Sequence, residues 1–124
     1  MADLADTQER PVRKKPFASP YVLTLSVIDG GDGTGVFRIN KARVIIGRSQ
    51  LVDFYIEDEQ ISNEHFAIEV TGTVYTLIDL DSRNGTELND RPVAAEQRSR
   101  LKHADEITVG DLRLLFTVNR FRER

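Results

Sequence analysis

Short runs of alternating apolar and polar residues, separated by turn signals, constrain this chain to an all-β fold. In residues 21–28, Leu23, Leu25 and Val27 alternate with Thr24 and Ser26, which is the two-residue period of a strand. Two apolar runs flank Thr71-Gly72-Thr73, a typical hairpin turn. We find no window of ten or more residues with helical periodicity. Turn signals about every 8–12 residues predict a β-sandwich or barrel.

The remaining strand candidates complete a single domain. They cover residues 36–39, 43–46, 53–56, 66–70, 74–78, 86–88, 91–93, 97–101, 106–109 and 112–118. A chain of 124 residues with 40% hydrophobic side chains fits one domain plus tails and can bury a core. We therefore expect a disordered tail at 1–19, a folded domain at 20–121, and a short C-terminal tail at 122–124.

Composition and charge exclude several classes of function. The absence of cysteine rules out disulfides, zinc–thiolate sites and thiol nucleophiles, and two histidines leave little room for a metal site. We expect no metal and no cofactor. The formal net charge is -3, with -6 on residues 21–117 and basic ends, which argues against a nucleic-acid partner. The cluster Arg13-Lys14-Lys15 is too short to change that expectation.

The distribution of apolar residues predicts a cytoplasmic protein without a membrane partner. No run approaches the roughly 20 apolar residues that span a bilayer. The polar N-terminus also lacks the apolar stretch of a signal peptide.

The glycine-rich segment 29–35 does not carry a known phosphate or calcium motif. A P-loop needs Gly-Lys-Ser/Thr followed by a helix, whereas a strand candidate follows here. An EF-hand needs a twelve-residue loop between two helices. We therefore interpret this segment as a flexible hairpin loop.

Three loop segments are richer in polar and glycine residues than ordinary turns. They are Ile46-Gly47-Arg48-Ser49, then residues 61–66 with Ser62 and His65, and then residues 79–86 with Asn84-Gly85-Thr86. Each lies at the end of a predicted strand, where a β scaffold presents its binding residues. Each motif alone is weak, but their order and spacing are specific.

The chain contains the motifs Gly-Arg, Ser-x-x-His and Asn-Gly-Thr, in this order over about 40 residues. This arrangement resembles that of the forkhead-associated (FHA) domain family. The resemblance covers roughly residues 21–119. It implies an FHA-type β-sandwich of about eleven strands in two sheets, whose loops at one end bind phosphothreonine. The function it implies is that of a non-catalytic, monomeric signalling module. Its partners would be Ser/Thr kinases or other proteins that carry phosphothreonine.

The resemblance assigns phosphopeptide binding to six polar residues: Arg48, Ser49, Ser62, Asn63, Arg83 and Asn84. Phosphothreonine carries about -1.5 to -2 charge and three acceptor oxygens. A guanidinium can donate to two of these oxygens at once, and a serine hydroxyl adds a neutral donor. The asparagine amides suit contacts with the peptide backbone.

Four further motif residues are expected to support the site. We expect Gly47 to allow a close approach that a β-carbon would block, and Gly85 to supply a positive φ. Thr86 is expected to tie its loop through the hydroxyl. The resemblance implies that His65 hydrogen-bonds between loops, whereas His103 is expected in an exposed turn.

Two alternatives stay open from the sequence. Acidic residues surround the motifs, and Gln60 stands where some family members have a basic residue, which favours a scaffold that binds its partner without phosphate. The acidic residues are Asp58, Glu59, Glu64, Asp79 and Asp81. A hydrolase using Ser62 and His65 is disfavoured, because residues three apart in a loop rarely form a catalytic pair and no nucleophile elbow is present.

Thr7 in the predicted tail is a candidate phosphorylation site. Roughly 13 flexible residues would let a phosphorylated Thr7 reach this pocket or that of a neighbouring molecule.

Overall fold

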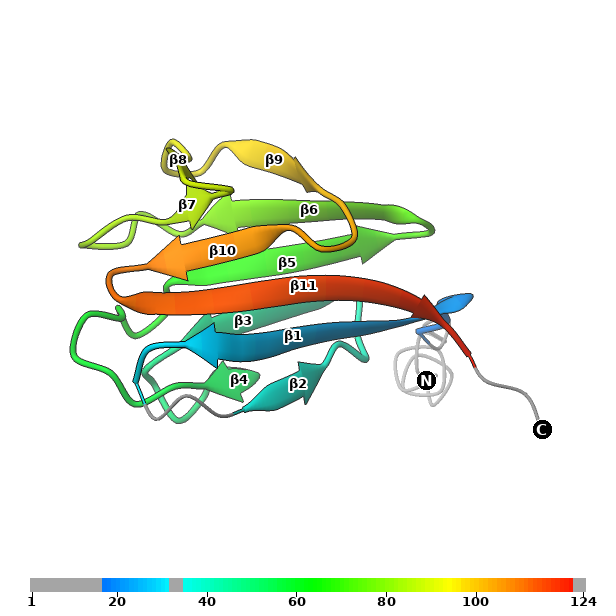
Figure 1. Ribbon diagram of the computed structural model, residues 1–124, viewed down its shortest axis with the longest axis horizontal. Helices are drawn as coiled ribbons and strands as arrows, with labels where there is room; N and C mark the ends of the chain where they lie inside the picture. Colours follow the sequence, from blue (N-terminus) through cyan, green and yellow to red (C-terminus); the bar gives the residue numbers. More distant parts are fainter. Residues whose placement is uncertain (1–16, 32–34, 122–124) are drawn as a thin grey trace, which may run out of the picture.

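The chain forms two β-sheets that pack face to face (Figure 1). The computed structural model describes residues 17–31 and 35–121. The six-stranded sheet has the order β2-β1-β11-β10-β7-β8, and the five-stranded sheet has the order β4-β3-β5-β6-β9. No helix occurs among the described residues. The predicted all-β sandwich of about eleven strands is therefore confirmed.

The strands agree closely with those expected from the alternation of apolar residues. The six-stranded sheet contains β1 (Tyr21–Asp29), β2 (Val36–Arg38), β7 (Glu87–Leu88), β8 (Arg91–Pro92), β10 (Glu106–Val109) and β11 (Leu112–Arg120). The five-stranded sheet contains β3 (Arg43–Gly47), β4 (Phe54–Tyr55), β5 (Phe66–Thr71), β6 (Val74–Asp79) and β9 (Arg98–Leu101). The β4 strand pairs parallel to β3, an arrangement that the sequence pattern did not indicate.

The core lies between the sheets and is built from every second residue of the long strands. Leu23 and Leu25 of β1 and Leu114 and Phe116 of β11 are almost fully buried. They pack against side chains of β5 and β6 such as Ile68, within one continuous cluster. Burial of apolar surface at about 25 cal/mol per Å² makes this cluster the main stabilising contribution to the fold.

The strands β1 and β11, from opposite ends of the sequence, lie side by side in the middle of the six-stranded sheet (Figure 1). The hydroxyls of Thr24 and Thr117, 93 residues apart in sequence, form a hydrogen bond between them. The fold therefore closes by joining the two ends of the domain.

Residues 17–19 of the predicted tail contact the domain. Phe17 packs against the core, and the backbone N–H of Tyr21 donates a 3.1 Å hydrogen bond to the Ser19 hydroxyl. Residues 1–16 and 122–124 lie outside the described residues, and so do Thr7 and the basic cluster at 13–15. Residues 32–34 of the glycine-rich segment also lie outside, while a 2.8 Å backbone bond from Val27 to Gly35 closes the base of that loop.

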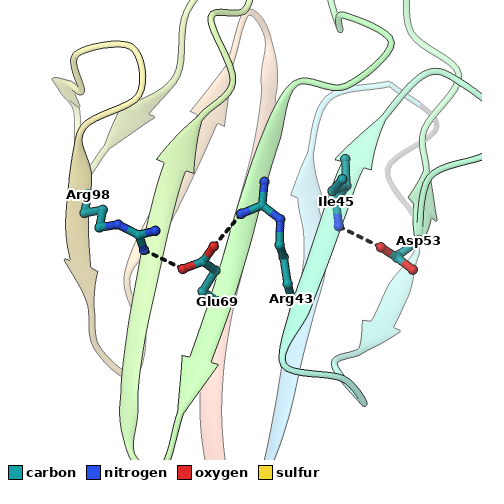
Figure 2. A network of polar contacts seen from close by, with 5 residues as sticks. All are labelled: Arg43, Ile45, Asp53, Glu69 and Arg98. Carbon is teal, nitrogen blue, oxygen red and sulfur yellow. Dashed lines mark hydrogen bonds and ion pairs between the residues drawn. The ribbon is translucent and has the colours of Figure 1, made fainter. Parts of the chain in front are cut away.

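The outer face of the five-stranded sheet carries a charge network (Figure 2). The Glu69 carboxylate on β5 lies between the guanidiniums of Arg43 on β3 and Arg98 on β9 and pairs with both. Near the edge of the sheet, Asp53 accepts a 2.8 Å hydrogen bond from the backbone N–H of Ile45. These contacts join β3, β5, β9 and the segment just before β4 across the surface of the sheet.

The two ends of the sandwich differ. The β3–β4, β4–β5 and β6–β7 loops, which hold all three sequence motifs, lie at one end (Figure 1). The β5–β6 turn, the start of β1 and the end of β11 lie at the other end. Within the described part of the chain, no helix is long and apolar enough to cross a membrane.

Candidate functional site

Gly47, at the end of β3, lets two of the motif loops lie in direct contact. A β-carbon at this position would come within 2.0 Å of the Asn63 carbonyl oxygen, so the close approach expected from the sequence is present. The backbone N–H groups of Arg48 and Ser49 then donate to the carbonyls of Ser62 and Asn63, at 3.0 and 3.2 Å. These bonds fix where the Arg48 side chain begins relative to Ser62.

His65 is fully buried and connects two loops through both ring nitrogens. Its Nδ1 accepts a 2.9 Å hydrogen bond from the backbone N–H of Ser62, so Nε2 carries the proton and donates to the Gly85 carbonyl at 2.8 Å. Burial lowers the pKa of His65, and this effect outweighs the opposing influence of Gly85 and the Asp79 charge. A neutral imidazole therefore holds the loops together.

This geometry contradicts the hydrolase alternative. Neither nitrogen of His65 faces the Ser62 hydroxyl, because backbone groups occupy both. A general base must lie within hydrogen-bond reach of the proton that it removes. His65 therefore cannot activate Ser62 in this arrangement.

The Ser62 hydroxyl accepts a 3.0 Å hydrogen bond from the backbone N–H of Arg83, which joins the β4–β5 and β6–β7 loops. Because the oxygen is the acceptor in this bond, the hydroxyl proton stays available to donate elsewhere. The half-buried Arg48 and the exposed Arg83 flank it on separate loops. Among the described residues, neither arginine forms an ion pair with a carboxylate. Arg83 Nη2 donates a long 3.5 Å hydrogen bond to the Glu59 carbonyl. The Arg48 guanidinium, the remaining donors of Arg83 and the Ser62 hydroxyl proton are thus available to an anionic ligand.

Asp79 organises the β6–β7 loop. Unlike the other acidic residues near the motifs, it is only 2% exposed. Its carboxylate accepts hydrogen bonds from the Ser82 N–H and hydroxyl and from the Thr86 hydroxyl, the last at 2.6 Å. Burial raises the pKa of Asp79, but these donors and nearby His65 outweigh burial, so its pKa is lowered.

Ser82 continues this organisation to the glycine that follows Asn84. Its hydroxyl accepts a 3.0 Å hydrogen bond from the Gly85 N–H, and Gly85 has φ 84°, the positive value expected for it. The role of Ser82 was not predicted. An aspartate followed three residues later by serine is a common turn pattern and could have indicated it.

The remaining predicted binding residues, Ser49, Asn63 and Asn84, are placed differently from one another. The Asn84 amide donates to the Gln60 carbonyl at 2.8 Å, so its nitrogen braces the neighbouring loop. Asn63 is exposed beside the site, and the Ser49 hydroxyl accepts a 3.1 Å bond from the Leu51 N–H. All six predicted binding residues belong to the three loops at this end of the sandwich.

Gln60 links the site to a fourth loop, which the sequence did not reveal. Its side-chain carbonyl accepts a 2.8 Å hydrogen bond from the Asp111 N–H in the β10–β11 turn.

Among the described residues, no group of three or more potential ligands is arranged to hold a metal ion.

Comparison with known proteins decides the family. The family model described as "FHA domain" matches residues 44–110, which is more than half of the chain. The chain belongs to the FHA-domain family.

Relatives of this FHA domain occur in bacterial regulators. It is 36% identical to the FHA domain-containing protein FhaA of Mycobacterium tuberculosis over 88 residues, which cover 71% of this chain and 16% of FhaA. It is 31% identical to the oxoglutarate dehydrogenase inhibitor of Corynebacterium jeikeium, over 78% of this chain and 66% of the relative. The chain thus spans only part of the length of each.

Solved structures show the same sandwich. The FhaA FHA domain, complexed with the intracellular domain of Rv3910, superposes with a TM-score of 0.67 and 31% identity, covering 76% of this chain and 98% of that chain. An FHA domain from a study of phosphothreonine-dependent interactions superposes with a TM-score of 0.68 and 32% identity, covering 83% of this chain and 99% of that chain.

The acidic residues around the loops of this FHA domain differ in exposure. Asp58 is half-buried and accepts a 2.9 Å hydrogen bond from the Gln60 N–H. Glu59, Glu64 and Asp81 are exposed to solvent, where ions screen their charge beyond about 8–10 Å.

Proposed function

We propose that this FHA domain binds phosphothreonine in extended segments of partner proteins and catalyses no reaction. The observation that carries the proposal is the Ser62 hydroxyl, whose oxygen accepts from the Arg83 N–H while its proton is left to donate. With the guanidiniums of Arg48 and Arg83, this hydroxyl offers donors to several phosphate oxygens.

The asparagines and Ser49 extend the proposed site along the peptide. Asn63 is exposed beside Ser62 and can donate to and accept from a peptide backbone. Asn84, held by Gln60, still offers its amide oxygen as an acceptor. Backbone contacts on both sides of the phosphothreonine would hold the peptide extended.

The partner class follows from the family. The solved complex of the FhaA FHA domain with an intracellular domain of another protein supports a protein partner, and phosphothreonine arises from Ser/Thr kinases. We also propose that the protein is cytoplasmic and monomeric.

Thr7 stays a predicted phosphorylation site. Treatment with a Ser/Thr kinase followed by mass spectrometry tests whether Thr7 becomes phosphorylated.

A phosphothreonine peptide library tests the function. Titration by fluorescence anisotropy should find peptides that bind only when phosphorylated. Arg48→Ala and Ser62→Ala should each weaken binding by roughly 10–100-fold, the equivalent of about 1.5–3 kcal/mol for a hydrogen bond to a charged group. Arg120→Ala, which removes an exposed arginine at the other end of the domain, is the control and should bind as the parent does.

The opposite result would identify a scaffold. If partners captured from a lysate are retained after phosphatase treatment and by the Arg48→Ala variant, binding does not depend on phosphate. The exposed acidic residues near the loops would then contribute to a phosphate-independent interface.

A further inference from the structure

A groove opens between the two sheets at the end of the domain opposite the motif loops. Its volume is about 600 Å³, within the range of pockets that hold ligands. The groove is lined by residues of β1, β6, β9 and β11 and of the adjoining turns. Tyr75 in this groove and Asp79 in the motif loops lie at opposite ends of β6, about 13 Å apart at the usual rise of a strand.

The floor of the groove is aromatic and aliphatic. Tyr75 and Leu101 are buried, and Tyr75 packs on Phe116 with ring centroids 5.5 Å apart. Tyr21 and Val118 are partly buried and complete the floor. This surface suits a large apolar or aromatic side chain of a ligand.

Tyr75 carries a hydrogen-bond donor that lies beneath the surface of the groove. Its hydroxyl is buried and has no hydrogen-bond partner among the described residues, although most buried polar groups in proteins are paired. Burial, with nearby Tyr21, raises the pKa of the Tyr75 phenol, so it stays protonated and able to donate.

The rim of the groove is basic. Arg100 and Lys102 are exposed, and neither forms an ion pair with another described residue. Arg98, two residues before Arg100, is by contrast paired with Glu69 on the outer face of the sheet. The described residues that line the groove include no carboxylate. The positive rim is therefore left to attract a negative ligand.

We propose that this groove docks a short acidic segment of a partner protein, with an apolar or aromatic side chain at its centre. That side chain enters over Tyr75 and Leu101, and the flanking carboxylates pair with Arg100 and Lys102. Because the groove and the motif loops lie at opposite ends, one domain can hold two segments at once, which raises the overall affinity for a partner that carries both.

NMR titration of the full chain labelled with ¹⁵N tests the proposal. The probe is an acetylated and amidated peptide with two glutamates on each side of a phenylalanine. We expect saturable shifts at the amides of Thr73, Lys102 and Val118 and none at Arg48 and Ser62. Peptides with serine in place of phenylalanine, or lysines in place of glutamates, should bind at least tenfold more weakly. No saturable shifts, or shifts confined to the motif loops, would overturn the proposal.

Matched variants separate the groove from general charge effects. Arg100→Glu should weaken binding of the probe peptide at least tenfold. Arg91→Glu makes the same change in net charge at an exposed position of β8 and should leave binding of the probe unchanged. Equal affinities of these two variants would contradict the docking site.

Sedimentation velocity tests whether a second copy fills the groove instead. We expect the parent chain to sediment as a monomer over a wide concentration range. Self-association that Arg100→Glu abolishes would overturn the proposal in favour of a second copy as the occupant.

Discussion

The hydroxyl of Thr86 donates a 2.6 Å hydrogen bond to the carboxylate of Asp79, and both residues are only 2% exposed. The bond spans the β6–β7 loop, from the last residue of β6 to the residue before β7. A buried carboxylate without such donors would be strongly unfavourable, so this pair sets the shape of the loop that presents Arg83 and Asn84.

Removal of the Thr86 hydroxyl should therefore lower stability. Thr86→Val keeps the shape of the side chain but takes one donor from a buried charge, and we expect the free energy of unfolding in urea to fall by about 1–3 kcal/mol. Thr71→Val, at an exposed position on β5, is the control and should change it little. Equal effects of the two substitutions would contradict the role of the Asp79 bond.

The stability of the domain should fall as the pH is lowered through the range in which histidine titrates. Burial lowers the pKa of His65 from its usual 6.5. The unfolded chain then binds a proton more readily than the folded one, so the stabilisation is complete above pH 6.5 and is lost as pH falls through the folded pKa. Urea unfolding at a series of pH values measures this loss.

His65→Gln provides the test of this assignment and should lose the pH dependence. A pH dependence that persists in His65→Gln would exclude His65 as its source.

Gly47→Ala should separate two of the motif loops. The added carbon would lie 2.0 Å from the Asn63 carbonyl oxygen, and backbone on both sides would have to move. We expect lower stability and, if the proposed function holds, at least tenfold weaker binding of a phosphothreonine peptide. Gly72→Ala introduces strain at φ 62° but meets no atom within 4 Å, so it should cost about 1 kcal/mol and leave peptide binding intact.

The charge network of Figure 2 should contribute only slightly to stability. Glu69 pairs with Arg43 and Arg98 near the surface, where water and salt weaken ion pairs. Glu69→Gln should lower the melting temperature a little in dilute buffer, and the difference from the parent should vanish in about 1 M salt. Glu87→Gln, at an exposed position on β7 without an ion pair among the described residues, should show no such salt-dependent difference.

The sequence predicted the strands well because a half-buried strand has a period of two residues. The alternation around Leu25 and the turn at Gly72 were enough to place β1, β5 and β6. The parallel pairing of β4 with β3 could not be predicted, because two residues of strand carry no period and the pairing depends on distant contacts.

At the candidate site, the sequence predicted the motifs and some of their contacts. The close approach at Gly47 and the hydrogen bonds of His65 between loops were expected, because the order and spacing of the motifs are specific to a family. The buried state of Asp79 and the bridge from Gln60 to Asp111 depend on how loops pack in space. No local pattern distinguishes an exposed acidic residue from one that neighbouring hydroxyls surround.

The pairing of β1 with β11 has a consequence for how the domain folds. The segment 44–110 that matches the family model contains neither strand. Contacts such as that between Thr24 and Thr117, 93 residues apart, require a large loss of chain entropy before they stabilise anything. We therefore expect slow folding with late closure of the six-stranded sheet, and a chain on the ribosome cannot complete that sheet until β11 has emerged.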